Sequence, residues 1–269
     1  MTLKTENLIA LIAPAIDIAR AAGEKIMEVY CTDFSVSKKD DLSPLTEADM
    51  AAHNTILEGL NKLMPGWPVL SEEAASIPFA QRSSWQRYWL VDPLDGTREF
   101  VKRNGDFTVN IALIEQQRVV LGIVYVPVSG VCYYAAAGHG AYKQNPHESA
   151  VPIHVRPWRE GVCTVMGSRS HRGTSLDGFL ANLGNYEILS VGSSLKVCLI
   201  AEGKADIYPR LGPTSEWDTA AAQCIVEEAG GYITDTQMQP LRYNTKNSLL
   251  NPHFFAFGDS RKDWSQFLP

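Results

Sequence analysis

The chain has 269 residues, of which 45% are hydrophobic and 20% are charged, values typical of a globular protein with a substantial core. Its formal net charge of −6 argues against non-specific binding of nucleic-acid polymers. An acidic protein that handles an anionic substrate needs a cation at its site. The five cysteines are scattered and lack C-x-x-C spacing, which favours free thiols in a reducing compartment over disulfides or a zinc site.

The N-terminal residues 1–20 carry charged side chains around a short apolar stretch. They lack the basic, apolar and small-residue order of a signal peptide. No apolar run approaches the length of about 18 residues that a membrane-spanning helix needs. We therefore expect a cytoplasmic protein without a transmembrane segment, a monomer or a homodimer, and leave open peripheral contact with the cytoplasmic face of the inner membrane.

The first half of the chain predicts two helices followed by a sheet. Apolar residues recur on one helical face over residues 7–30, and Pro14 within this pattern predicts a kink or a helix that begins near it. Residues 46–63 predict a second helix, which begins at Thr46 and stops before Pro65. An antiparallel meander is predicted from three strands, at 107–115, 119–126 and 131–135.

The second half alternates strands with helices after a stretch rich in Gly, Pro and Asn, residues 138–152, which is the best candidate for a boundary. Strands are predicted at 163–167, 187–191, 205–208, 232–234 and 254–257, and helices at 175–183, 194–202 and 216–229. We predict an α+β half at 1–145 and an α/β half at 146–269, which pack tightly and can count as one domain. Residues 143–160 match no motif.

The most informative segment is Trp-Leu-Val-Asp-Pro-Leu-Asp-Gly-Thr at 89–97. A strand-like run brings Asp92 and Asp95 to a predicted turn at Pro93 and Gly96, because proline fixes its own φ and glycine reaches backbone angles closed to other residues. Two converging carboxylates suit a hard cation such as Mg²⁺. A solvated surface turn is the alternative from this segment alone.

Two more segments carry acids: Glu-Glu at 72–73, after an apolar run, and Trp-Asp-Thr-Ala-Ala at 217–221. With Asp-Pro-Leu-Asp-Gly-Thr, they resemble the three signature blocks of the inositol monophosphatase superfamily, in the family's order and over nearly the whole chain. The resemblance implies an α+β fold, a layered αβαβα sandwich, and a lithium-sensitive phosphatase. It also implies two or three Mg²⁺ ions, held by Glu72, Asp92, the Leu94 carbonyl, Asp95 and Asp218.

Asp49 and Asp218 each have a second interpretation. Thr-Glu-Ala-Asp at 46–49 and Ser-Glu-Trp-Asp at 215–218 both look like capping boxes at helix starts. Capping and metal ligation by Asp218 are compatible. The resemblance implies that Asp49 and Thr97 activate the nucleophile, with Asp49 accepting the Thr97 proton while Thr97 accepts one from water.

Further segments resemble the superfamily's 3'(2'),5'-bisphosphate nucleotidases. Arg-Glu-Phe at 98–100 follows the Asp-Gly-Thr motif, and Gly-Ser-Ser-Leu-Lys at 192–196 and Tyr-Pro-Arg at 208–210 resemble the block that binds the second phosphate and ribose. Ser-Arg-Ser-His at 168–171 resembles the segment beside the adenosine. The substrate contacts implied are Glu72, Leu94, Asp95, Gly96, Thr97, His171, Ser193, Lys196, Arg210 and Asp218.

The resemblance thus implies Mg²⁺-dependent hydrolysis of adenosine 3',5'-bisphosphate to AMP and phosphate. Adenosine 3'-phosphate 5'-phosphosulfate is a second expected substrate, which connects the enzyme to sulfur assimilation. One alternative is an inositol or fructose-1,6-bisphosphate phosphatase of the same superfamily. Another is a non-catalytic Mg²⁺- or nucleotide-binding regulator, which would be expected to lose at least one of Asp49, Asp95, Thr97 or Asp218, and all four are present.

Overall fold

The computed structural model describes residues 5–32, 47–168 and 174–269. The outermost layer consists of two helices, α1 (Thr5–Tyr30) and α2 (Glu47–Leu63). Pro14 lies inside α1, so the alternative that this helix begins near the proline is wrong. A proline inside a helix removes one hydrogen bond, and here apolar side chains on both sides of it, from Leu8 to Ile26, are buried against the sheet and α2.

A seven-stranded sheet lies next to these helices. Its strands follow in chain order: β1 (Val69–Ser71), β2 (Arg87–Asp95), β3 (Thr108–Glu115), β4 (Arg118–Val126), β5 (Val131–Ala136), β6 (Gly140–Gln144) and β7 (Val151–Pro152). The predicted meander is confirmed as β3 to β5. The Gly-rich stretch expected to hold a boundary also contains β6 and β7, which extend the same sheet. The division into two halves stays a prediction.

The second sheet has the order β11-β12-β10-β8-β9. Its strands are β8 (Cys163–Ser168), β9 (Tyr186–Val191), β10 (Ile207–Arg210), β11 (Tyr232–Asp235) and β12 (Phe254–Phe257), and its helices are α5 (Thr174–Leu183), α6 (Leu195–Ala201) and α7 (Glu216–Glu228). Each predicted strand and helix of this half is confirmed, with ends shifted by up to two residues. Short elements that the sequence did not predict are α3 (Phe79–Arg82), α4 (Thr97–Val101) and two 3₁₀ turns, Glu72–Ala74 and Trp264–Phe267.

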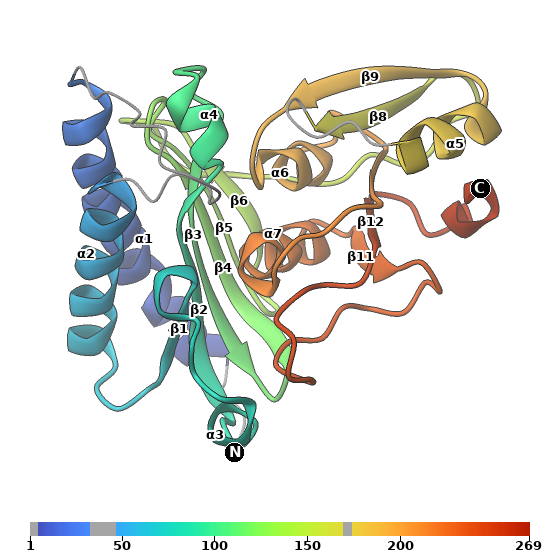
Figure 1. Ribbon diagram of the computed structural model, residues 1–269. Coiled ribbons are helices and arrows are strands. Elements are labelled where there is room, and N and C mark those ends of the chain that lie inside the picture. The colour runs from blue at the N-terminus through green and yellow to red at the C-terminus, as the bar shows by residue number, and fades with distance from the viewer. Residues whose placement is uncertain (1–4, 33–46, 169–173) are drawn as a thin grey trace.

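The elements stack in five layers (Figure 1). Helices α1 and α2 cover one face of the large sheet, α6 and α7 lie between the two sheets, and α5 lies on the far side of the small sheet. Three clusters of buried apolar residues fill the spaces between layers. The predicted α+β fold, a layered αβαβα sandwich, is therefore confirmed.

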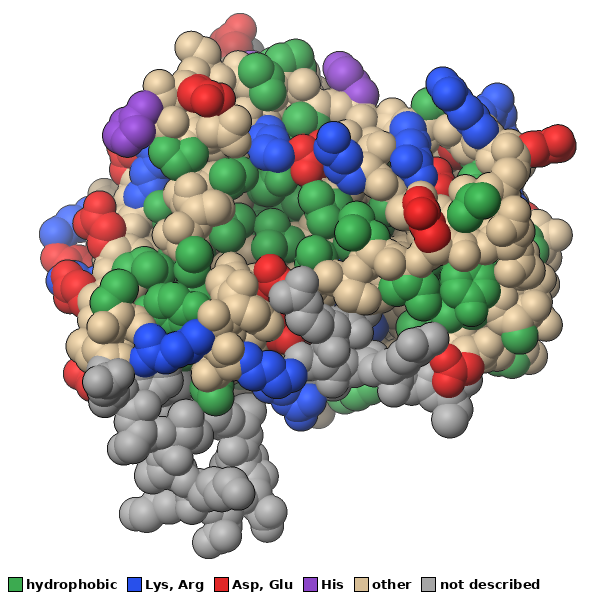
Figure 2. Space-filling view, turned by 90° about the horizontal axis from the view of Figure 1, so that it is seen from above, with side chains coloured by type: hydrophobic (Ala, Val, Ile, Leu, Met, Phe, Trp, Pro, Cys, Tyr) green, Lys and Arg blue, Asp and Glu red, His purple; other side chains and the backbone are tan. Residues whose placement is uncertain are grey.

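Seen from above, Lys and Arg side chains lie beside Asp and Glu around a central hydrophobic area (Figure 2), so this face is not uniformly negative despite the net charge. All five cysteines lie in the described ranges and are unpaired. Within those ranges no helix is long and apolar enough to cross a membrane.

Candidate active site

A bulge in β2 brings two acids to the same side of the strand. Asp92 pairs with Asn110 and Asp95 with Thr108, so three residue steps on β2 match two on β3. Side chains alternate along a regular strand, and residues three apart would point to opposite faces. The extra residue restores the alternation, and both aspartates line one cavity. The predicted turn is thus a strand bulge, at which Pro93 is tolerated.

Gly96 lies between β2 and α4, as the N-cap residue of α4. Its φ of 97° lies in the left-handed region, and a Cβ there would meet the Asp106 carbonyl oxygen at 3.2 Å. Both the backbone conformation and the close approach therefore favour glycine. The chain turns at this residue so that Thr97, the first residue of α4, also lines the cavity.

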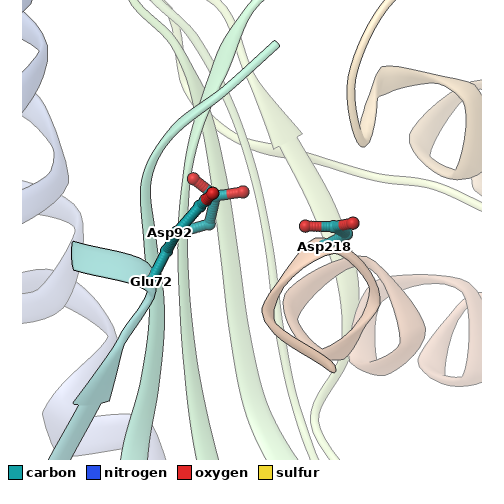
Figure 3. A group of neighbouring side chains, drawn as sticks. All are labelled: Glu72, Asp92 and Asp218. Carbon is teal, nitrogen blue, oxygen red and sulfur yellow. The ribbon is translucent and has the colours of Figure 1, made fainter. Parts of the chain in front are cut away.

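Glu72 and Asp218 reach the same cavity from elsewhere in the chain. The parallel pairing of β1 with β2 places Ser71 opposite Val91, so that Glu72 emerges beside Asp92. Asp218 is the third residue of α7, and its Oδ2 accepts the Ser215 backbone N–H at 2.9 Å. Glu72, Asp92 and Asp218 each offer a carboxylate oxygen within 4.8 Å of the others (Figure 3). The predicted capping role of Asp218 is confirmed and is compatible with metal ligation.

Burial and mutual repulsion raise the pKa values of these acids. Loss of solvation, followed by the charge of Asp95, raises the pKa of Glu72 to about 7 and that of Asp218 to about 8. Burial also raises the pKa of Asp92 well above its usual range, with Glu72 as the strongest charged neighbour. A cation in this cluster would favour the ionised carboxylates and would therefore lower their pKa values.

Asp49 is buried in the first turn of α2 and contributes to the same electrostatic environment. Burial raises the pKa values of Glu72 and Asp92, and the negative charge of Asp49 raises them further. Asp49 does not line the cavity that contains Thr97. Thr46, its predicted capping partner, lies outside the described residues, as does His171.

The same cavity also carries two cationic side chains. Lys196 on α6 is 5% exposed, donates to the Ser193 carbonyl oxygen at 2.7 Å and lies 5.3 Å from the centre of the Tyr208 ring. Burial lowers its pKa to about 8. Arg210 at the end of β10 donates to the Pro213 carbonyl oxygen at 2.9 Å, and its buried Nε has no hydrogen-bond partner among the described residues. A bound anion would stabilise the buried charge of Lys196 and could accept a hydrogen bond from the Arg210 Nε.

The cavity has a volume of about 450 Å³. It brings together most of the residues expected from the sequence: Glu72, Asp92, Leu94, Asp95, Gly96, Thr97, Ser193, Lys196, Arg210 and Asp218. It also contains Ser194, and Asn110 lies next to it through a hydrogen bond to Ser194 Oγ. The sequence did not indicate either residue, because nothing in their local pattern marks a contact with Asp95, which lies 99 residues before Ser194 and 15 before Asn110.

The raised pKa values predict that the metal-free protein loses stability as pH increases. The protonated acids contribute stability that is fully present below their ordinary pKa values of 3.8 to 4.5 and is lost as pH rises through about 7 to 8. In EDTA, the Tm should therefore fall between pH 5 and about pH 9. Thermal melts across this range measure the slope.

Asp218→Asn tests the source of this slope, since its amide oxygen can still accept the Ser215 N–H. This variant should flatten the decline. The matched control is Glu58→Gln, an exposed acid paired with Lys62, which should leave the slope between pH 5 and about pH 9 unchanged. A Tm that rises with pH in EDTA would contradict the electrostatic description of the cluster.

Comparison with known proteins agrees with this architecture. A model of the inositol monophosphatase family matches residues 7–261. The 3'(2'),5'-bisphosphate nucleotidases CysQ of Salmonella typhimurium and Escherichia coli K12 are 52% and 50% identical over 241 residues, which cover 88% of this chain and 95% of each relative. The crystal structure of CysQ from Bacteroides thetaiotaomicron has a TM-score of 0.81 at 42% identity, covering 94% of this chain and 97% of that one. The chain belongs to the inositol monophosphatase family.

Proposed function

We propose that this protein is a Mg²⁺-dependent 3'(2'),5'-bisphosphate nucleotidase, a phosphoric monoester hydrolase that converts adenosine 3',5'-bisphosphate to AMP and phosphate. One observation carries the proposal: a single cavity is lined by an acidic cluster and by two cations, the buried Lys196 and the partly buried Arg210. A substrate with two phosphates can meet both groups at once. The nucleotidases from Salmonella typhimurium and Escherichia coli provide independent support through their similarity.

The donor set fits magnesium. The carboxylates of Glu72, Asp92, Asp95 and Asp218 and the Leu94 carbonyl offer only hard oxygen ligands. In this role they would hold two or three ions. When bound, Mg²⁺ would activate a water molecule and neutralise charge on the phosphate and the leaving oxygen.

Asp49 and Thr97 would handle the proton of the attacking water. Thr97 lies at the cavity wall, and Asp49 lies within electrostatic reach of the acidic cluster. In the proposed relay, the Thr97 hydroxyl accepts a proton from water as Asp49 accepts the hydroxyl proton. The backbone N–H groups of Gly96 and Thr97 would contact the reacting phosphate.

Lys196 and Arg210 would bind the distal phosphate, with Ser193 contributing a polar contact. Ser193 has a φ of 48°, a strained conformation for a residue with a Cβ and one that often occurs at ligand sites. A 5'-phosphosulfate presents the same negative charge to these residues, so adenosine 3'-phosphate 5'-phosphosulfate is a second proposed substrate. Contact between His171 and the adenosine, the oligomeric state and the cytoplasmic location stay predictions.

The alternatives account less well for the cavity and the similarities. Inositol monophosphatases hydrolyse a substrate with one phosphate and would have no use for Lys196 and Arg210. Fructose 1,6-bisphosphate has two phosphates, and against it counts the similarity of the chain to the CysQ nucleotidases. A non-catalytic regulator would have no need for the complete set of Asp49, Asp95, Thr97 and Asp218. The arrangement therefore favours a nucleotidase that acts in sulfur assimilation, where it would remove adenosine 3',5'-bisphosphate.

A substrate panel tests the proposal. Phosphate release is measured side by side from adenosine 3',5'-bisphosphate, inositol 1-phosphate and fructose 1,6-bisphosphate, with Mg²⁺ and then with added Li⁺. The bisphosphate nucleotide should have the highest kcat/KM, and millimolar Li⁺ should inhibit. Asp92→Asn, purified identically, controls for contaminating phosphatases. A preference for inositol 1-phosphate would overturn the assignment.

The acidic cluster also predicts stabilisation by metal. Mg²⁺ at about 100 times its dissociation constant should increase the free energy of unfolding by roughly 2.7 kcal/mol, if the unfolded chain does not bind it. The reason is that each ion relieves repulsion among buried carboxylates, including Asp92 and Asp218. Melts at pH 8 in EDTA and in Mg²⁺ measure the effect. Identical midpoints would contradict a metal site here.

A further inference from the structure

Asp95 is held by an unusually dense set of donors, all directed at one oxygen. Its Oδ2 accepts the backbone N–H of Ser194 at 2.7 Å and the Ser194 hydroxyl at 2.7 Å. It also accepts a hydrogen bond from Asn110 Nδ2 at 3.3 Å, and the Thr108 hydroxyl lies 3.5 Å away but only 2.9 Å from Asn110 Oδ1. The two shortest contacts come from one residue in the other half of the chain, so Ser194 contributes most to the orientation of this carboxylate.

Ser194 also contacts residues of three other elements, β2, β3 and α7. It is 4% exposed, and its Oγ lies 2.9 Å from Asn110 Nδ2 on β3 and 2.8 Å from the Asp218 carbonyl oxygen on α7. A hydroxyl donates only one hydrogen, and the charged carboxylate of Asp95 is the stronger acceptor. The Ser194 hydroxyl is therefore expected to donate to Asp95 while it lies in contact with the start of α7, so Ser194 lies between the two places that present the proposed metal ligands Asp95 and Asp218.

The position of Ser194 suggests a simpler role that its contacts do not support. It precedes α6 directly, where serine commonly caps a helix through its side chain. Its side chain makes no capping hydrogen bond to α6; instead, the Ser193 hydroxyl accepts the Leu195 N–H, at 3.5 Å. The Ser194 hydroxyl is directed away from its own helix and towards Asp95.

We propose that Ser194 is a positioning residue for the metal site: it fixes the Asp95 carboxylate through Oδ2, which leaves Oδ1 for the cation. This inference rests on the proposed role of Asp95 as a ligand. Residues that orient metal ligands typically change metal affinity or activity by about 10- to 100-fold when they are replaced. Because Lys196 follows two residues later, the same contact joins the proposed metal ligands to the segment that carries a proposed phosphate contact.

The test is the affinity for Mg²⁺, measured by isothermal titration calorimetry without substrate. Ser194→Ala removes the hydroxyl but keeps the backbone N–H, and should weaken Mg²⁺ binding by roughly 10- to 100-fold. Ser194→Cys keeps the approximate volume with a weaker donor and should fall between it and the wild type. The matched control is Thr164→Val on β8, which removes a buried hydroxyl bonded to Glu187 and should not change Mg²⁺ affinity.

Two further measurements separate positioning from a general structural role. In EDTA the Tm of Ser194→Ala should fall no further than that of Thr164→Val, and its activity should recover as Mg²⁺ is raised. Unchanged Mg²⁺ affinity would overturn the proposal, as would a large loss of Tm in EDTA with no recovery of activity. Because calorimetry needs no substrate, the result stands apart from the panel that tests the nucleotidase assignment.

Discussion

Asp49→Asn is expected to lower kcat by about 10²–10⁴-fold, the typical loss when a general base is removed. The amide keeps the shape of the side chain and can still accept a backbone N–H at the start of α2. It removes the negative charge and most of the basicity, so a relay through Thr97 should fail. The Tm should change by only a few degrees, and product affinity should be largely retained.

Variants of both Thr97 and Asp49 test the proposed proton relay. Thr97→Ser keeps the hydroxyl and should retain most activity, whereas Thr97→Val should lose as much as Asp49→Asn, and the double variant should lose little more. Glu47→Gln is the matched control, an exposed acid in the same helical turn. If Asp49→Asn has a near-normal kcat and a Tm close to that of the wild type, Asp49 is not the general base and its role is structural.

The sequence predicted the acids of the site but not how they are assembled. Asp92 and Asp95 were expected at a turn because Pro93 and Gly96 are turn residues. In the structure β2 continues through Asp95, since the pairing with β3 extends to Thr108. A bulge depends on the register between two paired strands, and the residues of one strand alone do not predict that register. Only its consequence, two acids on one side, could be inferred from the motif.

Ser194 shows the same limit for long-range contacts. Its backbone N–H and hydroxyl both reach a carboxylate 99 residues earlier, and the sequence predicted only a serine at a helix start. Helix positions in the second half were predicted well because apolar periodicity is a local signal. The strands β6 and β7 were missed because they are short and lie in a stretch rich in turn residues. Tertiary pairing stabilises them, since β6 pairs with β5 and β7 pairs with β6.

Lys196→Ala and Arg210→Ala are expected to reduce kcat/KM for adenosine 3',5'-bisphosphate by roughly 10- to 150-fold each. This corresponds to the loss of one charge-assisted hydrogen bond, about 1.5–3 kcal/mol. Adenosine 3'-phosphate lacks the distal phosphate and should lose far less. The difference is expected because Lys196 and Arg210, which line the same cavity as the acidic cluster, are proposed to bind the second phosphate, which adenosine 3'-phosphate lacks.

Measuring both substrates with each variant distinguishes binding from folding, since a damaged fold would lower both rates equally. Lys204→Ala, an exposed lysine just beyond α6, is the matched control and should affect neither substrate. Lys196→Arg keeps the charge but must fit a larger head group beside the Tyr208 ring, so it should recover part of the loss. If kcat/KM falls equally for both substrates, Lys196 and Arg210 are structural, and the preference for a bisphosphate must have another origin.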